Sequence, residues 1–329
     1  MSEQHPIPKH AFIFHMGSLG DGIVHWPLYR AMCRVGWNIT LVGEDSRTAL
    51  AAAEVTASIA LNPATTPPQT TGEREGQIRA QSCELPSFRN LWCAECAPAN
   101  IKPDVKLVIA MFEDARWLTG AKAMFAAARL VCHAALGYQP NSALWQEFEV
   151  AKLGQVAPRQ RSGSAIVMHL GAGAEAKRWP MHNFEQLQKL LTAEAFTNPL
   201  LQRTDGSPLP VHPIFGEVEL ARFTDTDHAT FARMCRFANP SHVPIAGLSK
   251  LASTIRLASI FIGCDTGPTH LAAQLGVPTV ALYSADQTDN WLPRGPMVRV
   301  VRPQRGGVEN ITPREVLDSV LVLRGNTAN

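Results

Sequence analysis

The chain has 329 residues, of which 46% are hydrophobic and 18% charged, and its formal net charge is +2. This composition is typical of a folded globular protein, and it excludes fibrous and intrinsically disordered classes. The small net charge gives no indication of nucleic-acid binding. No apolar run is long enough to span a bilayer and we identify no signal peptide, so we expect a cytoplasmic protein with two domains.

The first half alternates strands and helices, beginning with a strand that runs into the glycine-containing turn GSLGDG. The elements expected here are a strand over residues 10–16, a helix over Ile23–Val35 closed by Gly36, strands over 38–43 and Val105–Met111, and an Ala-rich helix over 120–137. Such an opening is typical of an α/β domain, in which parallel strands are joined by right-handed crossovers.

Residues 62–100 are polar and rich in Pro, Thr and Cys, and we interpret them as an irregular insertion. The insertion contains Cys83, Cys93 and Cys96, which include one C-x-x-C pair. A structural zinc site usually has a second pair at ligand spacing, and none follows. The seven scattered cysteines are typical of reduced thiols rather than a disulfide framework. We therefore expect no metal, with these three cysteines as weak candidates for ligands.

A linker rich in Gly, Pro, Ser and Arg is expected near residues 154–164, which divides the chain into domains of residues 1–158 and 159–329. The elements expected in the second domain are strands over 164–170, 209–216, 259–264 and 278–284, helices over Asn183–Leu191, 248–258 and 267–276, a helix ending near Phe237, and a last helix from Pro313 with Thr312 as its N-cap. Two Rossmann-like α/β domains leave a cleft at the carboxyl ends of their strands, where such sheets bind ligands.

The segment CDTGPTH places a helix start directly after the strand expected over 259–264. The first N–H groups of a helix lack intrahelical partners and carry partial positive charge, which suits a phosphate. Thr266 and His270 add donors, whereas the carboxylate of Asp265 suits sugar hydroxyls. The alternative is that Asp265 or Thr266 only caps the helix, which leaves the rest of the set without a role. The segment therefore indicates a ligand with a diphosphate beside a sugar.

The glycine-rich loop GAGAEAKRWP carries two cations, Lys177 and Arg178. They could neutralise a diphosphate leaving group, although a solvated basic pair is the simpler alternative. We expect Trp179, which follows directly, to be a rigid buried anchor for this loop. Glu217, with Glu219 as second candidate, comes at the end of a strand and could accept both hydroxyls of a ribose.

The turn GSLGDG contains Asp21 at the head of the first helix. Its glycine spacing differs from the dinucleotide fingerprint G-x-G-x-x-G, so a nicotinamide-dependent oxidoreductase is not expected. Asp21 could cap the helix, or it could act as a general base if it faces the cleft.

Three motifs make the sequence similar to glycosyltransferase family 9, the ADP-heptose:lipopolysaccharide heptosyltransferases. They are MGSLGDGIVHWPLYRAM, HLGAGAEAKRWPMHNF and FIGCDTGPTHLAAQLGVPTVALY. The resemblance implies a GT-B fold of two Rossmann-like domains, in which the C-terminal domain binds a nucleotide-diphospho-sugar and the N-terminal domain the acceptor. It also implies inverting transfer without a metal. No cofactor is expected, because the nucleotide-sugar is a substrate.

The resemblance also implies roles for individual residues. Asp21 matches the catalytic base, Lys177 the contact to the donor phosphates, and Asp265 the contact to the donor sugar. The diphosphate-binding turn would contain Thr266, Gly267 and His270, and Glu217, or less certainly Glu219, would lie near the ribose. Arg178 is a donor-side candidate from its charge alone. Gly20 and His15 lie on the acceptor side, and His15 stands where family members usually carry Arg or Lys.

The acceptor is the least determined part of this interpretation. The lipopolysaccharide core is anionic, and His15 makes the acceptor side less basic, although Arg30 and Arg34 could compensate. The cysteine-containing insertion is compatible with another glycan or a protein as acceptor, and peripheral contact with the inner face of the inner membrane is compatible with the family. Alternatives are a GT-B enzyme using a UDP- or GDP-sugar, a protein-glycosylating heptosyltransferase, and a non-catalytic sugar-nucleotide-binding protein.

Overall fold

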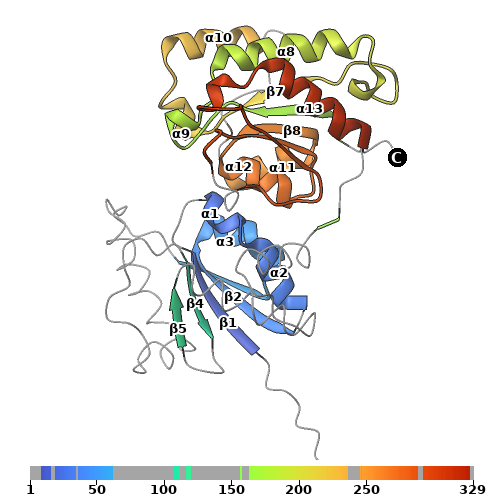
Figure 1. The fold of residues 1–329 in the computed structure, drawn as a ribbon. Coiled ribbons are helices and arrows are strands. Elements are labelled where there is room, and N and C mark those ends of the chain that lie inside the picture. Colours follow the sequence, from blue (N-terminus) through green and yellow to red (C-terminus); the bar gives the residue numbers. More distant parts are fainter. Residues whose placement is uncertain are drawn as a thin grey trace, which may run out of the picture. The chain divides into compact units, whose positions relative to one another are not determined.

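The chain divides into two compact units, Met1–Gln155 (the N-terminal unit) and Val156–Asn329 (the C-terminal unit) (Figure 1). The structure is a computed structural model, and it describes residues 9–15, 19–34, 36–61, 107–111, 116–119, 156–157, 163–235, 245, 247–287 and 292–326. The expected insertion with Cys83, Cys93 and Cys96 lies outside the described residues, and so does the Ala-rich helix over 120–137.

The N-terminal unit is built on a mixed five-stranded sheet of order β3-β2-β1-β4-β5. Its strands are β1 (Lys9–His15), β2 (Trp37–Glu44), β3 (Ala57–Leu61), β4 (Leu107–Met111) and β5 (Arg116–Thr119). β1, β2 and β3 are mutually parallel; the sequence predicts this for β1 and β2, but it did not identify β3 as a strand. β4 runs antiparallel to both β1 and β5. The sequence did not predict this reversal. The antiparallel pairing of β4 with β5 follows from their connection: residues 112–115 are too few for the crossover that parallel neighbours need.

The single helix expected over Ile23–Val35 is two helices, α1 (Leu19–Ile23) and α2 (Trp26–Arg34). Pro27 explains the break, since proline has no N–H to donate to the preceding turn and its ring crowds that turn. The chain restarts with the N–H groups of Leu28 and Tyr29, which both donate to the carbonyl of His25. As predicted, Gly36 ends α2, and its φ of +88° favours glycine. The unit also contains α3 (Asp45–Ala51) and the short turn η1 (Ala52–Glu54).

The C-terminal unit has an all-parallel sheet of order β10-β9-β8-β6-β7. Its strands are β6 (Ala165–His169), β7 (Val211–Ile214), β8 (Ala258–Cys264), β9 (Thr279–Leu282) and β10 (Val298–Val301). Every residue of β6, β8 and β9 is buried, as expected for a parallel sheet covered on both faces. The strand order reverses between β6 and β8, which creates the switch point at which α/β sheets bind ligands.

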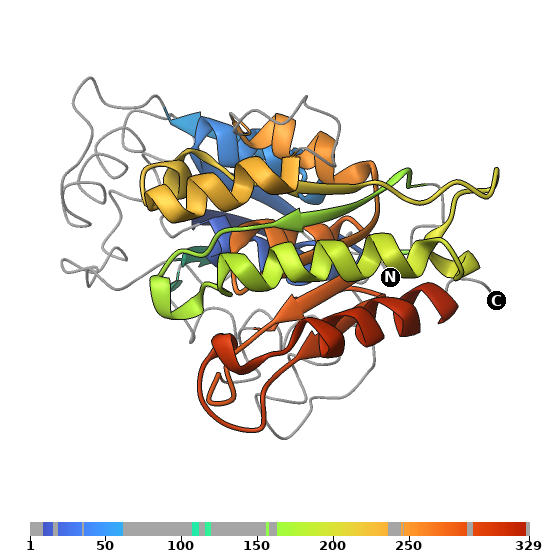
Figure 2. The ribbon, with the colours of Figure 1, turned by 90° about the horizontal axis from the view of Figure 1, so that it is seen from above.

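Helices cover both faces of this sheet (Figures 1 and 2). One face carries α8 (Met181–Ala195), α10 (Asp225–Cys235) and α13 (Pro313–Asn326), and the other carries α11 (Leu248–Arg256) and α12 (Gly267–Gln274). Shorter pieces are α9 (Glu217–Leu220), η2 (Glu175–Lys177), η3 (Pro199–Leu201) and η5 (Val308–Asn310). Within the described part of the chain, no helix has both the length and the apolar character that crossing a bilayer requires.

Thr312 caps α13, as the sequence predicts. Its N–H and hydroxyl both donate to Glu315 Oε2 at 2.7 Å, and its Oγ1 accepts from the N–H of Glu315 at 3.3 Å. This reciprocal arrangement is a capping box, which satisfies two donors at the helix start.

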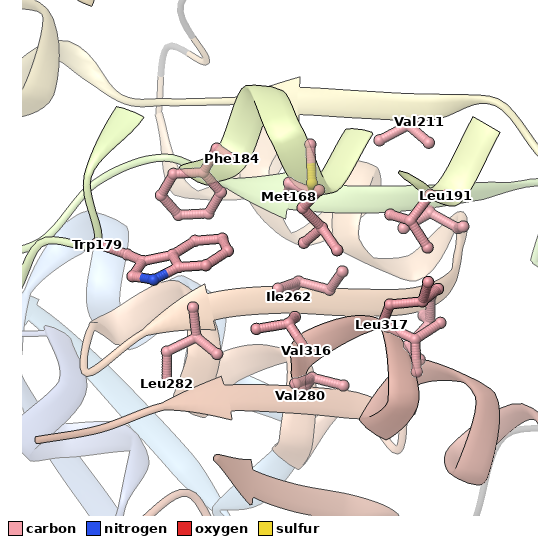
Figure 3. Packing of buried hydrophobic residues seen from close by; sticks show 14 of the residues in the cluster. Met168, Trp179, Phe184, Leu191, Val211, Ile262, Val280, Leu282, Val316 and Leu317 are labelled. Atoms are coloured by element: carbon pink, nitrogen blue, oxygen red, sulfur yellow. The ribbon is translucent and has the colours of Figure 1, made fainter. Parts of the chain in front are cut away.

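Trp179 fixes the loop between β6 and α8, and the close-up in Figure 3 shows it beside Phe184 in the core. Its ring is fully buried and packs edge-on against Phe184, with ring centroids 4.8 Å apart. Its indole N–H donates to the carbonyl of Ile311 at 2.9 Å, and its backbone N–H lies 3.4 Å from Cys264 Sγ. The expectation of a buried anchor is confirmed, and the anchor holds the segment that carries Lys177 and Arg178.

Candidate functional site

Lys177 and Asp265 meet at the switch point of the C-terminal sheet. Lys177 follows β6 and Asp265 follows β8, and these two strands are hydrogen-bonded neighbours. The ammonium of Lys177 donates to Asp265 Oδ2 at 2.6 Å, although the two residues are 88 positions apart. The Lys177 side chain is 46% exposed and that of Asp265 is 12% exposed. The structure therefore brings together two residues that the sequence assigns to one site.

Three further side chains surround the carboxylate of Asp265. Tyr283 donates to Oδ1 at 3.1 Å, Gln287 donates to Oδ2 at 3.2 Å, and His270 Nε2 lies 3.7 Å from Oδ1. Burial alone would raise the pKa of Asp265, but His270 and Lys177 outweigh burial and lower this pKa to about 2. Asp265 is therefore a fully charged carboxylate at neutral pH.

Sequence reasoning did not identify Tyr283 and Gln287 as site residues. Both follow β9, which pairs in parallel with β8, so the ends of these strands bring them to the turn that contains Asp265. Parallel neighbours deliver their carboxyl-terminal residues to the same edge of a sheet, and this rule could have found them once the strand order was known. Burial raises the pKa of the Tyr283 phenol, and the charge of Asp265 raises it further, so the phenol keeps the proton that it donates.

The start of α12 has no side-chain cap. Thr266 occupies the N-cap position, but its hydroxyl makes no cap hydrogen bond and instead donates to the carbonyl of Cys264 at 3.3 Å. Thr269 donates to the same carbonyl at 2.6 Å. These bonds tie the turn to β8, so the alternative in which Thr266 serves as a side-chain cap is wrong. Gly267 begins the helix, and the partial positive charge of this end lies beside the residues around Asp265.

His270 lies in the first turn of α12 and is 4% exposed. Its Nε2 faces Asp265, while its Nδ1 is buried and has no hydrogen-bond partner among the described residues. The imidazole is therefore held next to the carboxylate, and the expected contact between His270 and a diphosphate stays a prediction.

Arg178 pairs with another carboxylate. Its Nη1 donates to Asp227 Oδ2 at 3.3 Å, and its guanidinium lies 6.0 Å from the ring centroid of Phe223. Asp227 also accepts from the N–H and hydroxyl of Thr224 at the start of α10. Burial would raise the pKa of Asp227, but the bonds from Thr224 and Arg178 outweigh burial and lower it. Arg178 thus braces α10 against the loop, and its expected contact with the diphosphate stays a prediction.

The two acidic candidates for a ribose lie in α9. The side chain of Glu217 is outside the described residues, so its role stays a prediction. Glu219 Oε2 accepts from the N–H of Gly216 at 2.9 Å. Glu219 also packs against Gly171, where an added Cβ would come within 2.1 Å of Glu219 Cγ. Glycine at position 171 therefore lets the loops after β6 and β7 approach each other closely.

For the candidates on the acceptor side, the structure describes where the backbone lies. His15 ends β1, and Gly20 and Asp21 lie in α1, so Asp21 stands at the head of a helix as predicted. The side chains of His15 and Asp21 are outside the described residues, and their roles stay predictions.

Arg30 and Arg34 are the two basic residues that the sequence offered as compensation on the acceptor side. Arg30 pairs with Glu54 and lies 5.9 Å from the ring centroid of Trp26, so its charge is balanced within the N-terminal unit, while Arg34 is exposed. Among the described residues there is no cluster of His, Cys, Asp and Glu side chains that could hold a metal ion.

A family model described as "Glycosyltransferase family 9 (heptosyltransferase)" matches residues 226–316, a range that includes the segment CDTGPTH. No curated protein has a sequence that matches the chain significantly.

Solved structures match the chain over almost its whole length. The E. coli heptosyltransferase WaaC with ADP is 17% identical, with a TM-score of 0.55, and the match covers 95% of this chain and 99% of that one. E. coli ADP-heptose lps heptosyltransferase II is 18% identical, with a TM-score of 0.54 and coverage of 97% and 99%. A glycosyl transferase family 9 protein from Veillonella parvula is 13% identical, with a TM-score of 0.56 and coverage of 97% of both chains. The chain therefore has the GT-B fold, and its resemblance to glycosyltransferase family 9 is confirmed.

Proposed function

We propose that the chain is an inverting, metal-independent glycosyltransferase that moves a sugar from a nucleotide-diphospho-sugar to a glycan acceptor. The observation that carries this proposal is the Lys177–Asp265 pair beside the uncapped start of α12, at the switch point between β6 and β8. A cation and a helix N-terminus at one edge of a parallel sheet suit a diphosphate.

ADP-heptose is the proposed donor. Two observations support it: WaaC has been solved with ADP and with ADP-2-deoxy-2-fluoro heptose, and a second similar structure is named as an ADP-heptose lps heptosyltransferase. The proposed acceptor is a lipopolysaccharide core or a related glycan, with a protein as the alternative. Such an enzyme would act in the cytoplasm, at the inner face of the inner membrane.

Asp21 is the proposed general base. It would take the proton of the acceptor hydroxyl as that oxygen bonds to the anomeric carbon of the donor sugar. The bond from this carbon to the phosphate oxygen breaks on the opposite side, which inverts the configuration. The departing diphosphate carries the negative charge that Lys177 and the start of α12 would stabilise. Glu217, or Glu219, would hold the ribose.

The first experiment is a thermal-shift series on the full chain with ADP, GDP, UDP and NAD. A ligand at 100 times its dissociation constant stabilises the folded state by about 2.7 kcal/mol, so a bound nucleotide is readily detected. We expect stabilisation by ADP. Stabilisation by UDP or GDP instead would replace the proposed donor, and no shift with any nucleotide would contradict the proposal.

Two lysine variants control this experiment. Lys177→Met should lose most of the ADP shift, whereas Lys189→Met, on the outside of α8 with its ammonium 3.2 Å from Glu185, should keep it. Incubation with ADP-heptose and acceptor glycan then separates a transferase from a binding protein. The appearance of ADP and a glycan heavier by one sugar is expected only from the transferase.

A further inference from the structure

The carboxylate of Asp265 is held from both of its oxygens by residues that follow β9. Tyr283 donates to Oδ1 at 3.1 Å, and Gln287 donates to Oδ2 at 3.2 Å. Tyr283 is fully buried, and its hydroxyl cannot move without disturbing the core. The direction of the Asp265 carboxylate is therefore set by the neighbouring strand and not by its own turn alone.

The ammonium of Lys177 depends on that direction. Lys177 is nearly half exposed, and a long side chain at such a position samples many rotamers unless a partner holds it. Its partner is Asp265 Oδ2, at 2.6 Å. An ammonium has three N–H donors, so the bond to Asp265 leaves two that can reach a bound anion.

The capacity of Asp265 for further ligands is small. A carboxylate offers about four acceptor positions. Three receive hydrogen bonds, from Lys177, Tyr283 and Gln287, and His270 lies beside Oδ1. The main task of Asp265 in this arrangement is thus to hold its protein neighbours, and one position at most remains for a sugar hydroxyl.

We propose that Tyr283 and Gln287 are positioning residues that act through Asp265: they fix the Lys177 ammonium beside the start of α12, where it meets the diphosphate of the donor. This inference rests on the proposed function. It assigns to the end of β9 a share in donor binding, without requiring that either residue touches the donor.

The test compares a nucleoside diphosphate with its nucleoside, using the base that stabilises the wild type. Tyr283→Phe removes one hydroxyl at nearly constant volume. We expect it to weaken diphosphate binding by about tenfold in calorimetry, because Lys177 is then less well held. Nucleoside binding should not change, since the nucleoside does not use Lys177. A loss of equal size for both ligands would indicate general damage to the unit and would overturn the inference.

Tyr29→Phe is the matched control. The hydroxyl of Tyr29 is buried in the N-terminal unit and has no hydrogen-bond partner among the described residues. Its removal should leave the affinity for both ligands at the wild-type value.

A double-mutant cycle with Lys177→Met separates positioning from a merely structural effect. In the K177M background, Tyr283→Phe should cause no further loss of diphosphate affinity, because the side chain it positions is gone. An undiminished tenfold loss in that background would overturn the inference. Gln287→Leu should give the same pattern from a partly exposed site, and it carries the test if Tyr283→Phe lowers thermal stability.

The two proposals fail in different ways. A wild-type chain that binds no nucleoside diphosphate contradicts the proposed function and this inference with it. A wild-type chain that binds and transfers, with Tyr283→Phe and Gln287→Leu equal to it in diphosphate affinity, overturns this inference alone.

Discussion

The two units alternate strands and helices in the same style, but their sheets deliver residues to an edge in different ways. In the C-terminal unit β6 and β8 are parallel neighbours, so the segments after both strands reach one edge and bring Lys177 to Asp265. In the N-terminal unit β1 has the antiparallel β4 on one side, so these two strands end at opposite edges. All strands of the C-terminal sheet can therefore bring segments to one edge, whereas β1 has only one parallel neighbour, β2, and the segment after β4 lies at the other edge from the segment that carries Asp21. This difference suits the proposed division, in which the C-terminal unit binds the nucleotide and Asp21 supplies the base.

Asp21→Asn tests the division most strongly. If Asp21 is the base, turnover should fall by about 10²–10⁴-fold, because the amide cannot take the acceptor proton. Nucleotide affinity should stay at the wild-type value, since the C-terminal unit is expected to hold the nucleotide. Steady-state rates and calorimetry on the same preparation measure both. Near-normal turnover would refute the base, and a parallel loss of nucleotide affinity would break the comparison.

Trp179→Ala tests how far the C-terminal site depends on its core. The indole is fully buried, and truncation of such a side chain costs about 3–5 kcal/mol of unfolding free energy. Hydrogen exchange should show lost protection in β6 and β8, with β1 and β2 unchanged. Phe196→Ala is the control, since Phe196 is 71% exposed and surface changes are usually within about 0.5 kcal/mol. Equal loss of protection in both units would show that they are not independent.

Acid should weaken the C-terminal unit through two carboxylates. Hydrogen bonds from Arg233, helped by Lys189, outweigh burial and lower the pKa of Glu185 to about 2, and the pKa of Asp265 is also about 2. In the unfolded chain the pKa of Asp and Glu is about 4, so the stabilisation is complete above that pH and is lost as pH falls towards 2. Melting temperatures between pH 4 and pH 2 should therefore fall less steeply in the Asp265→Asn/Glu185→Gln double variant. An unchanged slope would contradict the assignment.

Thr312→Ala should have the smallest effect. It removes the capping box of α13 and should cost about 1 kcal/mol of unfolding free energy in urea titrations. Thr312→Ser keeps the hydroxyl and should recover most of this loss. If both variants were equally destabilised, the hydroxyl would not be the cause.

Sequence reasoning found the parts of the molecule that short-range chemistry determines. The segments around Lys177 and Asp265 were assigned to one site because each follows a hydrophobic strand, and Thr312 was identified as a cap from the proline that follows it. These signals are local, and the structure confirms the pairing and the cap.

The features that sequence reasoning missed depend on the pairing of strands that are far apart in the chain. The direction of β4 and the strand β10 follow from neighbours in the sheet, which no local pattern encodes. The contacts of Tyr283 and Gln287 with Asp265 follow from the parallel pairing of β9 with β8, which the sequence alone does not specify. The break between α1 and α2 was an exception, since Pro27 is a local signal that could have been used.

The hydrogen bond from the Trp179 indole to Ile311 has a consequence for the order in which the protein matures. It joins residues 132 positions apart, and the loop that carries Lys177 depends on it. Contacts of such long separation form late, because closing a long loop costs conformational entropy before the contact stabilises the fold. During synthesis the loop is locked only after the segment before α13 has left the ribosome. A chain that ends before Ile311 would lack this hydrogen bond, although every strand of the C-terminal sheet precedes Ile311. In such a chain we expect the loop with Lys177 to be less well held and nucleotide binding to be weaker.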